Sequence, residues 1–181
     1  MQQARYSPVA MGLHWLIAAL VIVNWRIADS AEGLPQAERL EIMKNHMSVG
    51  LTILVLVLLR LAWRLTHKPP ELASSLKPWE RASAKIVHVI FYVFLIGMPI
   101  AGWIANSFYG VGVGVYGLFT LPILPVPANP GIGHGIFEAH ATAGTILLIL
   151  IALHALGSLK HTFIDKDGNL FRMLPWGTPK A

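Results

Sequence analysis

The chain alternates between long apolar segments and short polar ones, and four of the apolar segments are long enough to cross a membrane. We expect spanning helices at residues 9–26, 44–65, 85–105 and 137–160. Each is close to the roughly 20 residues that a helix needs to cross a hydrocarbon core. Helices satisfy their own backbone polar groups, which lipid cannot do. The pattern therefore predicts an all-α transmembrane four-helix bundle that forms a single domain over residues 1–181.

Two parts of this pattern need interpretation. A cleaved signal peptide, with Arg5 as its basic start and residues 28–30 as its cleavage site, is the less favoured reading of the first segment. Residues 106–135 are apolar but rich in helix breakers, and we expect them to form an irregular loop at the interface or over the helices. The breakers in this loop are Gly110, Gly112, Gly114, Gly117, Pro122, Pro125, Pro127 and Pro130.

The composition agrees with a membrane protein. Hydrophobic residues make up 55% of the chain and charged residues only 13%, against about 25% charged in soluble domains. The net charge of +5 is too sparse for a nucleic-acid partner. Cysteine is absent, which excludes thiolate metal sites, iron–sulfur clusters and covalently attached haem.

The excess of basic over acidic residues indicates how the chain is oriented in the membrane. The two tails and the connection over residues 60–85 share one side, with eleven basic and four acidic residues. The opposite side has three basic and five acidic residues. Since basic residues concentrate on the cytoplasmic side of membrane proteins, we expect both termini in the cytoplasm of a multi-pass inner-membrane protein.

Five histidines fall within the expected spans, where an ionisable side chain is costly and indicates function. His46 and His140 fall near the outer face, and His14, His88 and His154 near the cytoplasmic face. Any one of them could instead be hydrogen-bonded to a neighbouring helix. The other histidines are His161, just beyond the fourth span, and His67 and His134, which we expect in connecting segments without a cofactor role.

The fourth span offers a ligand at each of two depths. His140 and His154 are fourteen residues apart, which returns to nearly the same helix face after a rise of about 21 Å. Haem fits this arrangement better than a small metal ion, because bis-histidine ligation needs one imidazole from each of two facing helices. Zinc needs four closely packed ligands. Near the cytoplasmic face there are three candidate ligands, His14, His88 and His154, and their positions alone do not show which two bind.

The sequence resembles the bacterial cytochrome b561 family, small four-helix cytochromes with two b haems. The residues that carry the resemblance are His14-Trp15, Asn45-His46 with Gly50, His88, and Glu138-Ala139-His140 with His154. It implies two non-covalent b haems, one held by His14 and His154 on the cytoplasmic side and one by His46 and His140 on the periplasmic side.

The resemblance also implies an acceptor. His88 and His161 are left over, and we expect them to line a ubiquinone pocket beside the cytoplasmic haem, where histidine can supply protons near neutral pH. A solvated His161 is the alternative. Arg60 and Arg64 are candidates for contacts with the haem propionates, although anchoring at the interface explains both equally well.

The sequence leaves three functions open. Stand-alone members of the family are similar to superoxide oxidase, so we expect superoxide as the electron donor, attracted by Arg26, Arg39 and Lys44. The second is a cytochrome b subunit that links a hydrogenase or other dehydrogenase partner to the quinone pool. The third is a haem-free transporter or scaffold whose histidines relay protons or join helices.

Overall fold

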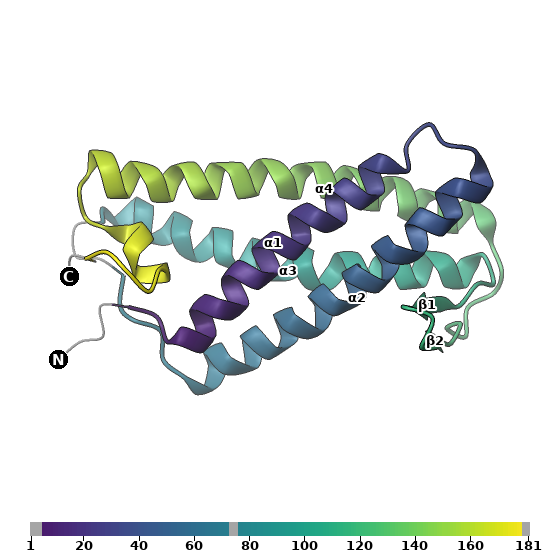
Figure 1. The fold of residues 1–181 in the computed structure, drawn as a ribbon, viewed down its shortest axis with the longest axis horizontal. Coiled ribbons are helices and arrows are strands. Elements are labelled where there is room, and N and C mark those ends of the chain that lie inside the picture. The colour runs from purple at the N-terminus through teal and green to yellow at the C-terminus, as the bar shows by residue number, and fades with distance from the viewer. Residues whose placement is uncertain (1–4, 73–75, 179–181) are drawn as a thin grey trace.

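The computed structural model describes residues 5–72 and 76–178, and in it four long helices lie side by side (Figure 1). Each of the four is long and apolar enough to cross a membrane, which confirms the predicted all-α transmembrane architecture. The helices are α1 (Pro8–Ser30), α2 (Gln36–Thr66), α3 (Pro78–Phe108) and α4 (Pro130–Leu159).

The helices extend beyond the apolar segments that predicted them. α2 begins at Gln36 and α3 at Pro78, each before its expected span. Polar residues can continue a helix outside the hydrocarbon core when the unpaired backbone groups at the helix end find hydrogen-bond partners. At the start of α3 the Glu80 carboxylate does this by accepting from the backbone N–H of Lys77 at 2.9 Å.

The prediction of an irregular loop over residues 106–135 was wrong at both ends. α3 continues to Phe108, and α4 begins at Pro130. Proline suits the first position of a helix because its missing N–H would have had no partner there, and the side chain of Asn129 accepts from the N–H of Ile132 at 3.2 Å. His134 therefore lies in α4 and not in a connecting segment.

Between α3 and α4 the chain forms a two-stranded hairpin, which the sequence analysis did not predict. Strand β1 (Val113–Val115) pairs antiparallel with β2 (Phe119–Leu121). The turn places Tyr116 and Gly117 at φ 49° and 71°, the positive values that tight hairpin turns need. Ser48 of α2 accepts from the N–H of Tyr116 at 2.9 Å, so the hairpin is fixed to the bundle.

The two ends of the bundle differ. The hairpin and the α1–α2 connection lie at one end (Figure 1). At the other, the described ends of the chain meet: Arg5 donates to the carbonyl of Pro175 at 3.0 Å, and Tyr6 N–H to that of Arg172 at 3.1 Å. A π-helical turn (Lys160–Ile164) and a 3-10 helix (Asn169–Met173) also lie at this second end. We call the two the hairpin end and the terminal end.

The buried core occupies the middle of the bundle. α1 packs on α2, α2 on α3, and α3 on α4. Many large apolar side chains, such as Val55 and Leu153, face outward instead, as expected where lipid surrounds the helices. The core consists of Ile17, Val21, Ile53, Val57 and Leu147.

Candidate functional site

Two pairs of histidine rings face each other across the bundle. His46 of α2 and His140 of α4 have ring centroids 6.0 Å apart and ring planes at 73°. His14 of α1 and His154 of α4 have centroids 6.3 Å apart and planes at 66°. The structure thus brings together both pairs that the sequence analysis expected to act as ligands.

A third ring joins the second pair. The His88 ring of α3 lies 5.8 Å from that of His154, at 71°. Phe91, one turn further along α3, lies 5.4 Å from the same ring. Ring geometry alone therefore gives His154 two partners of similar distance, His14 and His88, as the sequence analysis did.

A main-chain contact orients His46. Its Nδ1–H donates to the carbonyl of Asn24 in α1, with 3.1 Å between nitrogen and oxygen. A histidine with Nδ1 occupied in this way presents Nε2 as an unprotonated electron-pair donor. This is the arrangement typical of metal-binding histidines, whose other ring nitrogen donates to a backbone carbonyl or a carboxylate.

The distances between the paired rings suit one metal ion between two imidazoles. Imidazole nitrogens lie about 2 Å from a bound transition metal, so two rings on opposite sides of an ion have centroids about 6 Å apart. The donors in both pairs are neutral nitrogens, as in bis-histidine haem proteins. Among the described residues, Glu80, His161 and Asp165 lie close enough together to share a metal ion. This group lies outside both histidine pairs.

Buried apolar side chains separate the two histidine pairs. Leu147 lies midway between His140 and His154 in the sequence of α4, and only 5% of it is exposed. It packs in one cluster with Ile53 and Val57 of α2. The rise from His140 to His154 is about 21 Å along the helix. The two sites are therefore stacked along the bundle with a dry layer between them.

A basic cavity of about 250 Å³ opens at the terminal end, near the His14 pair. Arg60 lines it and donates to the carbonyl of Ala10 at 2.6 Å. Trp63 also lines it and stacks on His67, with centroids 3.7 Å apart. The cavity is lined by Tyr6, Ser7, Ala10, Arg60, Trp63, Arg64, His67, Lys68, Pro69, Pro70 and Tyr92. Its positive charge suits carboxylates, the groups that haem propionates present.

His161 lies in a different environment from His88. The structure places it in the π-helical turn after α4, where its Nδ1 lies 2.8 Å from a carboxylate oxygen of Asp165. Only 16% of its side chain is exposed, so the solvated alternative does not hold. Within the described ranges no hydrogen bond or ring contact joins His88 to His161.

The sequence analysis missed the charged groups around His161. The spacing of four between His161 and Asp165 could have indicated one of them, since residues at that spacing meet on a helix face. Glu80 comes from another helix, and no local pattern relates it to His161. His134, by contrast, forms an exposed pair with Glu138 at the hairpin end, with 3.8 Å between nitrogen and oxygen.

Comparison with known proteins agrees with this geometry. A family described as prokaryotic cytochrome b561 matches residues 5–176. The chain belongs to the prokaryotic cytochrome b561 family. It is therefore a membrane cytochrome that binds b haem and takes part in electron transfer, which makes the haem-free transporter or scaffold of the sequence analysis wrong.

Individual members of the family are similar over nearly the whole chain. The Yersinia pestis protein named "Probable superoxide oxidase CybB" is 29% identical, over 94% of this chain and 96% of its own length. "Cytochrome b561 homolog 2" of Escherichia coli strain K12 is 28% identical, over 94% and 91%. "Cytochrome b562" of Cereibacter sphaeroides is 27% identical, over 96% and 97%. This cytochrome thus matches each of these relatives over nearly the whole length of both chains.

Proposed function

We propose that this cytochrome is a superoxide oxidase with two b haems, which passes electrons from superoxide at the periplasmic face of the inner membrane to ubiquinone at the cytoplasmic face. The observation that carries the proposal is the presence of two facing histidine pairs at different depths in one bundle. When bound, each haem supplies a centre that accepts and releases one electron at a time. The choice of donor is supported by the name of the Yersinia pestis relative.

In this proposal His46 and His140 hold one haem iron, and His14 and His154 hold the other. The carbonyl of Asn24 keeps the His46 ring in the tautomer that binds metal. Resemblance to the family favours His14 over His88 as the partner of His154. Arg60 and Arg64 line a basic cavity beside the second pair, and we assign them to the propionates there.

We place the hairpin end in the periplasm and the terminal end in the cytoplasm. The support is the charge asymmetry of the sequence, with eleven basic residues on the side of the tails and three on the other. At the hairpin end Arg26 is paired with Asp29 at 2.9 Å, and Lys44 with Glu41. Of the three cations expected to attract superoxide, Arg39 is the one for which the described part of the chain shows no ion pair.

We place ubiquinone at the terminal end, along the seam between α3 and α4. His161 contacts Glu80 of α3, which precedes His88 by eight residues, about 12 Å along the helix. His88 therefore lies deeper and His161 nearer the end. A quinone between them would lie beside the His14 and His154 pair, with a titratable imidazole on each side of its ring.

The experiment that tests this function is rapid mixing of the purified, haem-loaded cytochrome with superoxide in the presence of ubiquinone. We expect the haem absorption bands to change to the reduced form and quinol to appear afterwards. Haems that stay oxidised, or that are reduced without quinol formation, would exclude the assignment. Stable co-purification with a dehydrogenase that reduces the haems would instead favour the subunit alternative.

A further inference from the structure

A basic stripe follows the end of α2 at the terminal end of the bundle. Arg60, Arg64 and Lys68 succeed one another at intervals of four residues, the spacing of neighbours on one helix face. α2 ends at Thr66, so Lys68 lies in the segment directly after it. All three cations line the cavity of about 250 Å³ at this end, and none of the described residues that line it is acidic. The cavity therefore carries positive charge that no lining carboxylate neutralises.

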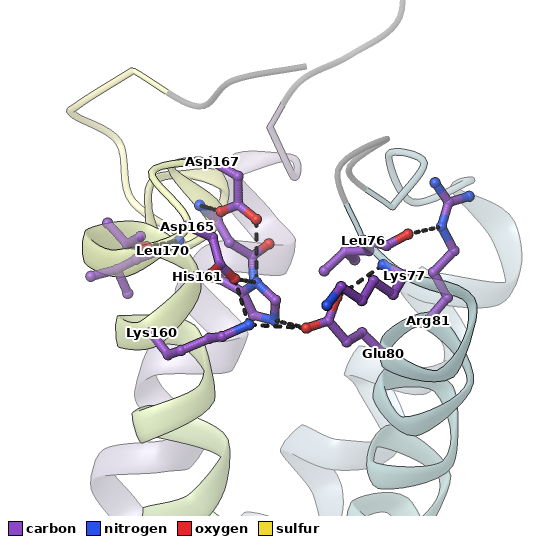
Figure 2. A network of polar contacts seen from close by, with 11 residues as sticks. Leu76, Lys77, Glu80, Arg81, Lys160, His161, Asp165, Asp167 and Leu170 are labelled. Atoms are coloured by element: carbon purple, nitrogen blue, oxygen red, sulfur yellow. Dashed lines mark hydrogen bonds and ion pairs between the residues drawn. The ribbon is translucent and has the colours of Figure 1, made fainter.

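The two outer cations of this stripe have no partner within the described part of the chain. Neither Arg64 nor Lys68 forms an ion pair or a hydrogen bond there. Other cations of the terminal end differ in this respect, as Figure 2 shows for the contact between α3 and α4. Lys160 Nζ lies 2.9 Å from Glu80 Oε1, and Arg81 Nε donates to a main-chain carbonyl at 3.0 Å. Arg64 and Lys68 are therefore available to an external anion.

Aromatic rings form much of the cavity wall. Trp63 stacks on His67, and its Nε1 donates to the Ser7 hydroxyl at 3.0 Å. Tyr6 and Tyr92 also line the cavity. Tryptophan and tyrosine concentrate where spanning helices meet the lipid headgroups, and this wall lies at the end of a helix that is long and apolar enough to span. The cavity thus opens at the level of the headgroups and not within the hydrocarbon core.

Exposed apolar side chains lie beside the basic stripe. Leu58 and Leu65 are 46% and 78% exposed, and their spacing of seven residues puts them on one face of α2. Because Leu65 directly follows Arg64, this face lies about 100° around the helix from the guanidinium. A ligand whose anionic group enters the cavity can therefore lay a hydrocarbon chain along α2, which a free anion cannot do.

The inner and outer parts of the cavity differ in their distance from the histidine pair. Arg60 lies deepest, since it donates to the carbonyl of Ala10, one turn before His14. The proposed function assigns Arg60 and Arg64 to the haem propionates. A guanidinium has five N–H donors, so Arg64 can serve a propionate on one side and a second anion on the other. Lys68 lies one turn further from the pair and serves the second anion alone.

We propose that the outer part of this cavity binds the phosphate of an anionic phospholipid. Arg64 and Lys68 hold the phosphate, and an acyl chain lies along Leu58 and Leu65. Basic pockets between spanning helices bind anionic headgroups of this kind. A zwitterionic headgroup fits less well, because it brings an ammonium group that the same cations repel.

The bound lipid joins three parts of the bundle. The cavity is lined by the start of α1, by the end of α2 with the segment after it, and by Tyr92 of α3. A phosphate there reduces the repulsion between neighbouring cations and stabilises the folded terminal end. This inference goes beyond the proposed function, because neither superoxide nor quinone takes part in it. The lipid site and the superoxide oxidase reaction can therefore fail independently of each other.

The test is lipid titration of the full-length, haem-loaded cytochrome in a neutral detergent. Phosphatidylglycerol is anionic, whereas phosphatidylcholine carries the same phosphate balanced by an ammonium group. Native mass spectrometry counts the lipids bound per chain, and the thermal unfolding temperature is measured alongside. The variants are Lys68→Gln, Lys68→Arg and Arg64→Gln. The matched control is Lys85→Gln, which removes an exposed cation of α3 at the same end but outside the cavity. Haem content and spectrum show that each variant is folded.

We expect the wild type to retain one phosphatidylglycerol and to unfold at a higher temperature as this lipid is added, because a ligand of the folded state stabilises it. Lys68→Gln and Arg64→Gln should each weaken the binding about fivefold, the effect of removing one cation near an anionic lipid. Lys68→Arg keeps the charge and Lys85→Gln leaves the cavity intact, so both should bind like the wild type.

Three results would overturn the lipid site. The first is wild-type affinity for phosphatidylglycerol in both Gln variants of the cavity, or equal affinity of the wild type for phosphatidylcholine. The second is a haem-loaded wild type that retains no phosphatidylglycerol, which would mean that the propionates fill the cavity. The third is inorganic phosphate that displaces phosphatidylglycerol and raises the unfolding temperature by itself, which would make the ligand a free anion.

Discussion

Arg60 of α2 reaches across to α1 and donates to the main-chain carbonyl of Ala10, with 2.6 Å between Nη1 and oxygen. Ala10 lies one turn before His14 on the same helix. The contact therefore fixes a positive charge beside the histidine pair of the terminal end, at a half-buried position where water weakens its field less than at the surface.

The first prediction concerns this charge. A nearby cation stabilises the reduced form of a haem, which has one positive charge fewer on its iron. Arg60→Gln should therefore lower the midpoint potential of the haem at the terminal end and leave the other unchanged, as measured by a redox titration followed optically. Arg26→Gln at the hairpin end is the control, because Arg26 is exposed and paired with Asp29. Equal potentials in wild type and Arg60→Gln would contradict the placement of this arginine.

The second prediction concerns the ligands. His46→Ala and His14→Ala should each reduce the haem content from two per chain to one, because each removes one iron ligand of a different pair. Pyridine haemochrome quantitation measures this content directly. His88→Ala should retain both haems, since we assign His88 to the quinone and not to iron. Loss of a haem in His88→Ala, with both kept in His14→Ala, would make His88 the partner of His154.

The helices could be predicted from the sequence because lipid offers no hydrogen-bond partners to the backbone. A run of about 20 apolar residues that crosses lipid therefore forms a helix. The same register predicted that His140 and His154 share one face of α4, since fourteen residues return to it, but the pairing of His154 with His14 was implied by the resemblance to the family. The start of α4 at Pro130 could not be predicted in this way. Proline breaks a helix at most positions but is favoured at the first position of a helix. The hydrogen bond that the Asn129 side chain accepts from Ile132 N–H caps the helix and places Pro130 at that first position.

The charged groups around His161 show a second limit of the sequence. His161 and Asp165 are local neighbours, but Glu80 meets them only because α3 and α4 pack side by side. The π-helical turn also changes the register after Leu159, so the face on which His161 lies no longer follows from a spacing of 3.6 residues per turn. Contacts that depend on tertiary packing and on a local change of helix type leave no periodic signal.

The third prediction tests the close packing of α3 on α4. A Cβ atom added to Gly133 would lie 2.7 Å from Cε2 of Tyr109 and 3.1 Å from the carbonyl oxygen of Ala105. Gly133→Ala should therefore lower the thermal unfolding temperature of the cytochrome, at a cost of about 1–3 kcal/mol for overpacking. Gly135→Ala is a matched control two residues away, because nothing lies within 4 Å of its added Cβ. Equal unfolding temperatures for the two variants would show that the helices are further apart than the structure places them.

The fourth prediction concerns the attachment of the hairpin. The Ser48 hydroxyl accepts from the N–H of Tyr116 and donates to the carbonyl of Lys44 at 2.9 Å. Ser48→Ala leaves that N–H without its acceptor at a part-buried position, which costs about 1 kcal/mol, the low end of the penalty for an unsatisfied buried group. We expect faster hydrogen exchange over residues 113–121, measured by mass spectrometry. Thr66→Ala is the control, since in the described part of the chain its exposed hydroxyl, at the other end of α2, bonds within its own helix and to His67. Unchanged exchange in Ser48→Ala would mean that other contacts hold the hairpin, such as Tyr116 Oη with Thr52 and Trp103 Nε1 with the carbonyl of Pro122.

The last prediction concerns orientation, and the absence of cysteine from the chain makes it direct to test. Leu118 at the hairpin is 80% exposed and Trp176 near the terminal end is 65% exposed, so a cysteine at either position is accessible to a maleimide reagent. The excess of basic residues on the side of the tails predicts that the terminal end lies in the cytoplasm. In intact cells a reagent that cannot cross the inner membrane should therefore label Leu118→Cys and leave Trp176→Cys unlabelled until the membrane is broken. The reverse pattern would place the hairpin end in the cytoplasm, and superoxide would then have to reach the cytochrome at the terminal end.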